Sequence, residues 1–345
     1  MTDYARSSMK ERTLMNLKTT RKLSAAALIA ALALTGCAQG SISGGTDSST
    51  GSSSSSGLTK ATIGLFPSSA VGAIQLGVNK GYFEEEGIDL ELLLGQGSAA
   101  QLPSLTSGSL EFMLASPTTP LVATTKGLDV KIVAGYAKNR PDIVEDSVAV
   151  LVGPKSDITS AKDLEGKTVS INALGSIGDI GIREAIALDG GDPSKVNFVQ
   201  LGFNEVAAQL ESGEIDAGMA GPPFMQQIVA SGGSVISDFI NESKLGGAEL
   251  VIVSSGALAE KDPELVNGFN AALDKTLSYA EEHQDEVRGL LPQVLGTSEE
   301  AAAKTDFIEW DAELNVDALN QFADLMKKYS LVDERPDIEK TVWAK

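Results

Sequence analysis

The sequence predicts an α/β protein of two lobes, each a mostly parallel sheet flanked by helices, with a ligand cleft between the lobes. Strand-like and helix-like segments alternate after residue 60, which is typical of parallel sheets covered on both faces. Residues 105 positions apart also match in kind, which indicates an internal repeat. The matched positions are Gly97/Gly202, Leu105/Leu210, Ser107-Gly108/Ser212-Gly213, Leu110/Ile215, Ala115/Ala220, Pro117/Pro222 and Gly127/Gly232.

The first residues lie outside this repeat and predict export. Three cations, Lys18, Arg21 and Lys22, precede an apolar run over 23–34 that ends in Thr35-Gly36-Cys37. Twelve residues of helix cover roughly 18 Å, which is short of a hydrocarbon core of about 30 Å, so this run is a signal peptide and no membrane span. A lone cysteine directly after such a signal resembles the lipobox of bacterial lipoproteins. The resemblance implies cleavage before Cys37 and its lipidation, with the start codon left open among Met1, Met9 and Met15.

The segment after Cys37 predicts a flexible tether. Residues 38–58 are almost entirely Gly, Ser, Thr, Ala and Gln, so they bury too little apolar surface to offset the entropy of ordering them. About 287 residues follow, more than a typical single core holds. We therefore expect a signal peptide (1–36), a lipidated cysteine and linker (37–58), lobe one (59–148 and 252–345) and lobe two (149–251).

Composition excludes several classes of function. A net charge of −20 and a pI near 4.4 argue against nucleic-acid binding. The chain has one cysteine, Cys37, and one histidine, His283, which we expect to be an exposed side chain in a polar helical stretch. They leave no histidine triad, cysteine nucleophile or His/Cys zinc site, so we expect no enzyme activity, metal or cofactor.

In lobe one, short apolar runs predict strands and turn residues predict the starts of helices. The run 88–92 alternates between apolar and polar residues, which indicates one buried face. Pro67 ends the first strand, and Ser68 or Ser69 then caps a helix that Gly81 stops. The expected strands are 61–66, 88–92, 110–115 and 130–134, and the expected helices run from 68 or 69 to 80, over 82–86, from 98 and from 116–120.

Lobe two repeats this order. The expected strands are 168–171, 196–200 and 215–220, with helices after the loop 172–179 and from 202–205. Two further apolar segments, 147–152 and 249–254, predict crossings between the lobes. The tail 257–345 is mainly helical, and we expect it to pack on lobe one through apolar residues at helical spacing, namely Leu265, Phe269, Leu273 and Leu277.

Four segments of this chain resemble one known family. They are Lys80-Gly81-Tyr82-Phe83-Glu84-Glu85-Glu86-Gly87-Ile88-Asp89, Ser107-Gly108, Asp163-Leu164-Glu165-Gly166-Lys167 and Ser212-Gly213-Glu214-Ile215-Asp216-Ala217. Together they resemble the substrate-binding proteins of ABC importers for nitrate, sulfonates, taurine and thiamine-precursor pyrimidines, over nearly all of 60–340.

The resemblance implies a fold, a function and a location. The fold is that of type II periplasmic-binding proteins, which capture a small solute by lobe closure and deliver it to an ABC permease and, through it, to the ATPase. With the lipid anchor, the implied location is the outer face of the cell membrane. We expect the protein to act as a monomer.

The ligand of an open α/β sheet lies beyond the carboxyl ends of its strands, where loops lead into helices. Six loops qualify here: 66–69, 95–98 and 116–119 in lobe one, and 174–179, 202–205 and 221–224 in lobe two. Several of these loops lie at the start of a helix, where the free backbone N–H groups attract anions. The candidate ligand-binding residues are Phe66, Ser68, Ser69, Gly97, Ser98, Ser116, Thr118, Thr119, Gly175, Ser176, Asp179, Phe203, Asn204, Pro222 and Phe224.

The class of solute stays open at this point. The loops contain no Lys or Arg, and Arg183 is the nearest cation, so an anion would be held by dipoles and hydroxyls, as a sulfonate can be. Asp179 and Glu205 either pair with a ligand amine, as in taurine, or cap helices. Nitrate is disfavoured, because a small buried anion usually needs a fixed cation.

Aromatic residues favour a flat ring instead. Phe66, Phe203, Phe224 and Trp310 either stack on a heterocycle such as a pyrimidine or belong to the core. We expect a sulfonate or taurine-like solute first and a pyrimidine second. Two other classes of function are an enzyme of pyrimidine biosynthesis on the same fold and a sensory lipoprotein; neighbouring permease or kinase genes would separate transport from sensing.

Overall fold

The computed structural model describes residues 57–95, 97–140, 148–222 and 224–344. The predicted signal peptide, Cys37 and nearly all of the linker lie outside these residues, as do Gln96, Ser147 and Pro223. Within the described part of the chain, no helix is long and apolar enough to span a membrane.

Strands and helices alternate in the order that the sequence predicts. The strands are β1 (Thr59–Leu65), β2 (Ile88–Leu94), β3 (Phe112–Ala115), β4 (Val130–Lys138), β5 (Ala149–Val152), β6 (Thr168–Ile171), β7 (Asn197–Gln200), β8 (Ala217–Ala220), β9 (Ser234–Ser237), β10 (Leu250–Ser255) and β11 (Glu309–Trp310). The helices are α1 (Ala70–Asn79), α2 (Tyr82–Glu85), α3 (Ser98–Thr106), α4 (Thr118–Thr125), α5 (Ile177–Leu188), α6 (Phe203–Ser212), α7 (Phe224–Ala230), α8 (Phe239–Glu242), α9 (Gly256–Lys261), α10 (Pro263–Glu282), α11 (Gln284–Leu295), α12 (Glu299–Ala303), α13 (Val316–Lys328) and α14 (Ile338–Thr341).

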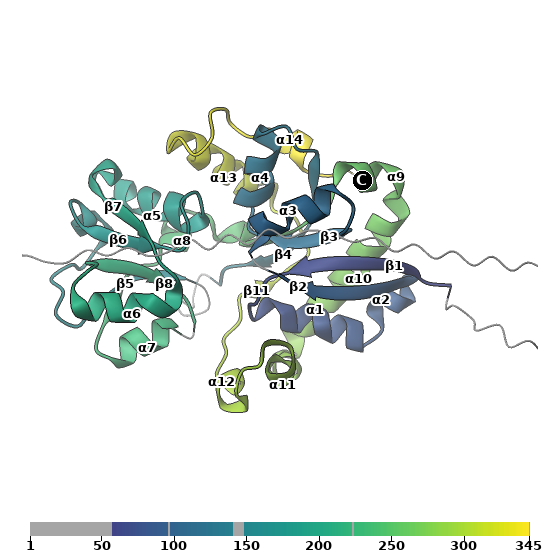
Figure 1. The fold of residues 1–345 in the computed structure, drawn as a ribbon, viewed down its shortest axis with the longest axis horizontal. Coiled ribbons are helices and arrows are strands. Elements are labelled where there is room, and N and C mark those ends of the chain that lie inside the picture. Colours follow the sequence, from purple (N-terminus) through teal and green to yellow (C-terminus); the bar gives the residue numbers. More distant parts are fainter. Residues whose placement is uncertain (1–56, 96, 141–147, 223, 345) are drawn as a thin grey trace, which may run out of the picture. The chain divides into compact units, whose positions relative to one another are not determined.

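The strands form two sheets with the same internal order (Figure 1). Sheet A has the order β11-β4-β10-β3-β1-β2, and sheet B has the order β7-β6-β8-β5-β9. In each sheet three neighbouring strands are parallel, and the strand that arrives from the other sheet, β10 or β5, runs antiparallel beside them. The α/β fold of two sheets is confirmed. The sheets are mixed because the segments expected to be crossings join them as inverted strands.

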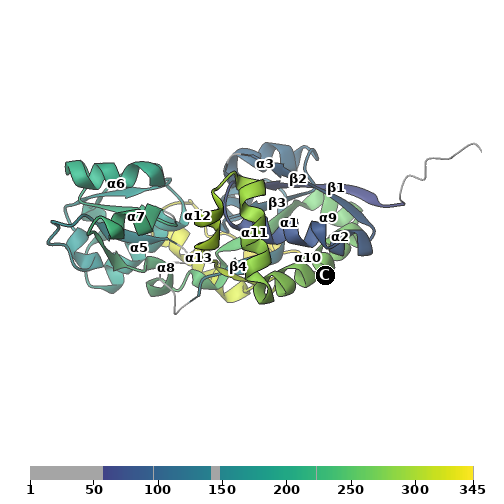
Figure 2. The same ribbon diagram turned by 90° about the horizontal axis from the view of Figure 1, so that it is seen from below.

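Each sheet is covered on both faces (Figure 1). On sheet A, one buried cluster joins the strands to α1, α10 and α11, and a second joins them to α3, α4, α13 and α14. Figure 2 shows α1, α10 and α11 from the side on which they cover the sheet. Sheet B has α5 and α8 on one face and α6 and α7 on the other. The lobe boundaries at 148/149 and 251/252 stay a prediction.

The long tail helix forms as its apolar spacing predicts. Leu265, Phe269, Leu273 and Leu277 of α10 are all buried against sheet A. Phe269 stacks on Phe112 of β3 with ring centroids 3.9 Å apart. Burying each such side chain contributes about 1.5–3 kcal/mol, so packing on the sheet is what holds the tail.

Several boundaries differ from the sequence-based expectations. Helix α5 begins at Ile177, inside the expected loop 172–179, because Ser176 caps it there by accepting a hydrogen bond from Asp179 N. The short strands β9 and β11 were not expected from the sequence. The expectation that His283 is exposed is wrong: its ring is half-buried and stacks on the Tyr279 ring, with centroids 3.8 Å apart.

Candidate functional site

The six candidate loops follow the parallel strands of the two sheets. In sheet A, strands β1, β2 and β3 lead into α1, α3 and α4, and in sheet B, β6, β7 and β8 lead into α5, α6 and α7. Because parallel neighbouring strands end at the same edge, each sheet gathers three loops at one edge.

Hydroxyl groups join two of the loops on sheet A. Ser98 Oγ lies 2.8 Å from Thr119 Oγ1, which connects the starts of α3 and α4. Ser116 Oγ lies 3.3 Å from Thr118 Oγ1 within the loop after β3. Thr118 is buried, whereas Ser98, Ser116 and Thr119 are partly buried. Four predicted residues therefore form two pairs of hydroxyls.

A buried amide of α3, not expected from the sequence, connects the loop after β2 to the third loop of sheet A, which follows β1. Gln101, 8% exposed, donates from Nε2 to Leu65 O over 3.2 Å at the end of β1. Leu65 O also accepts a bond of 2.8 Å from Gly95 N, at the end of β2. Gly64 makes room for this amide, since an added Cβ there would lie 2.0 Å from Gln101 Oε1.

The three helices that begin at this edge of sheet A share an unusual start. Helices α1, α3 and α4 each lack a side-chain cap, and none has an acidic residue in its first turn. Their positive ends are thus not neutralised by the protein's own carboxylates. Ser69, Gly97 and Pro117 stand at the cap positions, and the buried Ser68 Oγ has no hydrogen-bond partner among the described residues.

Sheet B differs because two of its helices, α5 and α6, carry an acidic residue in the first turn. Asp179, 4% exposed, lies in the first turn of α5; its Oδ2 accepts from Gly175 N at 2.8 Å and its Oδ1 lies 2.6 Å from Arg183 Nε. Arg183 also lies over the Phe198 ring, 4.4 Å from the centroid. Glu205 Oε2 accepts from Gly202 N at 3.0 Å, at the start of α6. Of the two alternatives for these carboxylates, the capping one accounts for both.

The aromatic candidates divide into two groups. Phe66, Phe203 and Phe224 are partly buried, and each packs against the core of its own sheet. Trp310 is 3% exposed and lies in the core of sheet A, which is the second of the two alternatives that the sequence left open for it. Of the remaining predicted residues, Gly97 and Asn204 are exposed, and Gly175, Ser176 and Pro222 are partly buried.

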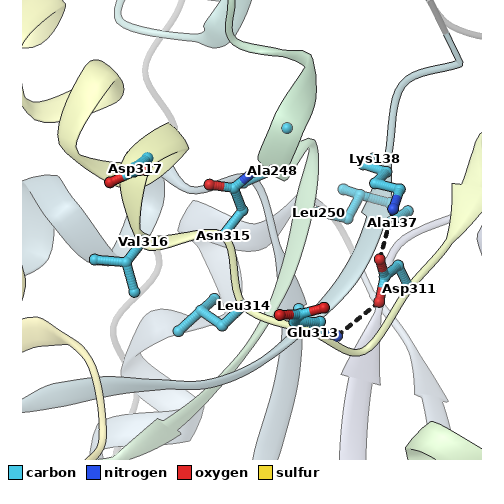
Figure 3. Close-up of a pocket in the computed structure, with 12 residues that line it drawn as sticks. Ala137, Lys138, Ala248, Leu250, Asp311, Glu313, Leu314, Asn315, Val316 and Asp317 are labelled. Atoms are coloured by element: carbon cyan, nitrogen blue, oxygen red, sulfur yellow. Dashed lines mark hydrogen bonds and ion pairs between the residues drawn. The ribbon is translucent and has the colours of Figure 1, made fainter.

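A cavity of about 400 Å³ lies away from these loops (Figure 3). Its walls come from the end of β4, the start of β10 and the connection from β11 to α13. Lys138 Nζ lies 2.7 Å from Asp311 Oδ2 and 3.1 Å from Glu309 Oε1, and Asp311 Oδ1 accepts from Glu313 N at 2.8 Å. Gly135 allows close approach, since an added Cβ would lie 2.3 Å from Glu313 O. None of the fifteen candidate residues lines this cavity.

No group of three or more His, Cys, Asp or Glu side chains able to hold a metal occurs among the residues that the structure covers. The loops offer hydroxyls and backbone amides for hydrogen bonding, and partly buried aromatic rings lie among them.

Comparison with known proteins places the chain in a family. The model described as NMT1/THI5 like matches residues 70–287. The chain belongs to the NMT1/THI5-like family. The match covers twelve of the fifteen candidate residues and confirms the resemblance seen in the sequence. The other three, Phe66, Ser68 and Ser69, lie directly before it.

Two curated relatives are similar in sequence. The formylaminopyrimidine-binding protein of Halalkalibacterium halodurans is 25% identical over 231 residues, 66% of this chain and 67% of the relative. The 4-amino-5-hydroxymethyl-2-methylpyrimidine phosphate synthase THI12 of Saccharomyces cerevisiae is 29% identical over 220 residues, 60% of this chain. The match spans 62% of the yeast protein's length.

A solved structure confirms the fold. The periplasmic aliphatic sulphonate binding protein SsuA from Escherichia coli aligns with a TM-score of 0.70 at 18% identity, over 83% of this chain and 92% of that chain. At this identity the likeness concerns the fold, which is that of periplasmic binding proteins.

Proposed function

We propose that this member of the family is an extracytoplasmic solute-binding protein that captures a small organic solute between its lobes and delivers it to an ABC permease. The observation that carries the proposal is the pair of loop sets at the carboxyl ends of the parallel strands, one set on each sheet. The loops of sheet A supply hydroxyls and unneutralised helix starts, and those of sheet B supply partly buried aromatic rings.

The first candidate for the solute is a substituted pyrimidine. Both curated relatives carry names that refer to a pyrimidine, one as its binding protein and the other as a synthase. The loops suit a solute without full charge, because the nearest cation, Arg183, is paired with Asp179. Phe66, Phe203 and Phe224 offer edges and faces for a flat ring.

A sulfonate or taurine-like solute is the second candidate. The uncapped starts of α1, α3 and α4 favour an anion on the side of sheet A. A fully charged sulfonate would there rely on hydroxyls and amide dipoles alone. The sequence relatives therefore reverse the order in which the sequence analysis placed the two classes.

The protein acts by binding and not by catalysis in this proposal. The chain's only histidine lies at the junction of α10 and α11, outside the six loops, and its only cysteine is Cys37. The yeast relative is named as a synthase, so enzyme activity is the alternative to test. Lipidation of Cys37 would hold the protein at the outer face of the cell membrane, close to the permease, as a monomer that needs no cofactor.

A thermal-shift screen tests the proposal. The panel contains 4-amino-5-hydroxymethyl-2-methylpyrimidine, formylaminopyrimidine, taurine, alkanesulfonates and nitrate. A ligand at 100 times its Kd adds about 2.7 kcal/mol to the free energy of unfolding, which raises Tm by about 4–5 °C at this size. A binding protein is supported if Tm rises with one class of compound and that compound is recovered chemically unchanged from the protein. Chemical conversion of the compound would support the synthase alternative.

A further inference from the structure

Helix α13 ends in a hydrogen-bonded turn that reverses the direction of the chain. Ser330 N donates to Lys327 O over 3.1 Å, and Leu331 N donates to Met326 O over 2.8 Å. This pair of bonds is the Schellman cap of a helix, which needs a left-handed residue between them. Ser330 takes that conformation with a φ of 57°. Residues 328–331 are called the latch below.

The body of α13 belongs to the core of sheet A. Leu319, Phe322 and Ala323 have no exposed surface and pack in one cluster with Met113 of β3 and Val253 of β10. The same cluster includes Ile180 of α5, a helix of sheet B. Helix α13 thus lies against both the sheet that it covers and a helix of the other lobe.

The latch holds a nearly buried carboxylate on α5. Lys328 Nζ lies 2.5 Å from Glu184 Oε2, and Tyr329 Oη donates to the same oxygen over 2.6 Å. Glu184 is 8% exposed, so its charge is shielded from water and depends on these two donors. Burial, and then the bond to Glu184, raise the pKa of the Tyr329 hydroxyl, which keeps it a donor at neutral pH.

The latch also covers the loop that precedes α5. Leu331 lies over Gly175, where an added Cβ would come within 3.1 Å of Leu331 Cδ1. Leu331, Tyr329 and Ile177 all pack at the border of the core cluster that contains α13. Gly175 N in turn donates to Asp179, so the latch, the loop and the first turn of α5 form one continuous set of contacts.

We propose that Glu184 and Leu331 are positioning residues for the loop 172–179: the latch fixes this loop of sheet B against a helix anchored in sheet A. This inference rests on the proposed function, in which the loop 172–179 contacts the solute. Fixing the loop before the solute arrives lowers the ordering cost of binding. Loss of the latch would then weaken binding without any change in the groups that contact the solute.

Hydrogen–deuterium exchange of the full chain without solute tests the latch directly. The variants are E184L, which removes the shared acceptor at similar volume, and L331A, which uncovers Gly175. The control is E300Q, which breaks the exposed Lys304–Glu300 pair of 2.8 Å on α12. We expect amides of 172–179 to exchange at least tenfold faster in both latch variants, with β1 and the E300Q protein unchanged.

The proposal would be overturned if amides of 172–179 in L331A exchanged at the wild-type rate. It would also be overturned if exchange in both variants became faster by the same factor over the whole chain, since the effect would then not be specific to the loop. If E184L does not fold, L331A and Y329F carry the test.

The binding arm uses 4-amino-5-hydroxymethyl-2-methylpyrimidine and taurine as probes. If wild type binds one of them, we expect Kd to rise about tenfold in L331A and to stay within twofold in E300Q. An unchanged Kd in L331A would contradict the positioning role. If wild type binds neither probe while the latch variants still exchange faster at 172–179, the latch is supported and the proposed solutes are refuted.

Discussion

Asp179 Oδ1 lies 2.6 Å from Arg183 Nε, four residues further along α5, so the cation nearest the candidate loops already has its partner. Asp179 is 4% exposed, and its second oxygen accepts from Gly175 N. The Arg183 cation is therefore matched by the Asp179 carboxylate, and Glu205 is a further carboxylate among the loops of sheet B. This pairing supports the order of the two proposed solutes, in which a neutral heterocycle stands above a sulfonate.

The pair also predicts a stability effect. Arg183→Leu should lower the free energy of unfolding by about 1–3 kcal/mol, because the variant leaves a buried carboxylate without its cation. Adding Asp179→Asn should recover part of the loss. Urea unfolding of the two single variants and the double variant measures the coupling. Losses that simply add would show that the two side chains do not interact.

Gly64 and Gln101 should depend on each other. Gly64→Ala places a Cβ 2.0 Å from Gln101 Oε1, so we expect a loss of about 1–3 kcal/mol in the free energy of unfolding. Gln101→Ala removes that obstacle, and the double variant should be more stable than the Gly64→Ala protein. Gly289→Ala is the control, since an added Cβ there meets nothing within 4 Å. Equal stability of the single and double variants would rule out the clash.

Ser330 should tolerate only residues that accept a left-handed backbone. The backbone at Ser330 has a φ of 57°. Ser330→Gly should therefore leave the free energy of unfolding unchanged or raise it by about 0.5 kcal/mol. Ser330→Val should lower the free energy of unfolding by about 1 kcal/mol or more. Thermal unfolding of both variants measures the difference. A Ser330→Val protein as stable as wild type would show that the turn after α13 is not held in this conformation.

Cys37 should decide where the protein is found. Cys37→Ser removes the thiol that the proposed lipid anchor requires, so we expect the protein to leave the membrane fraction and to keep its affinity for solute. Stable anchoring takes two or more acyl chains, which a serine at this position does not receive. Fractionation of cells that produce each form gives the result. A Cys37→Ser protein retained in the membrane fraction would exclude the lipid anchor.

Local sequence patterns predicted most strands and helices, because alternation in 88–92 and apolar spacing in 265–277 report burial directly. The internal repeat likewise anticipated two sheets of one order. The sequence left Trp310 open between the cleft and the core, since an isolated aromatic residue gives no sign of which side of a sheet it faces. Its burial in sheet A depends on β11, a two-residue strand without its own pattern.

The contacts that tie the site together were not predictable from the sequence. Gln101 contacts Gly64 and donates to Leu65 O, both more than 30 residues away, and nothing in the sequence around its amide indicates that it is buried. Glu184 meets Tyr329 across 145 positions in the chain. A glutamate in the middle of an amphipathic helix is normally exposed, so only the packing of α13 on α5 identifies this one as buried.

Isothermal titration of the full chain with 4-amino-5-hydroxymethyl-2-methylpyrimidine and with taurine, repeated on a Ser116→Ala/Thr118→Ala variant, tests the central claim most directly. The account predicts that wild type binds one compound, the pyrimidine first, at one molecule per chain. The double variant should bind it more weakly by about 1–3 kcal/mol, because two hydroxyl donors at the edge of sheet A are lost. Equal affinity of the two proteins would contradict the assignment of the loop after β3 to the site, and no binding of either compound to wild type would contradict both proposed solutes.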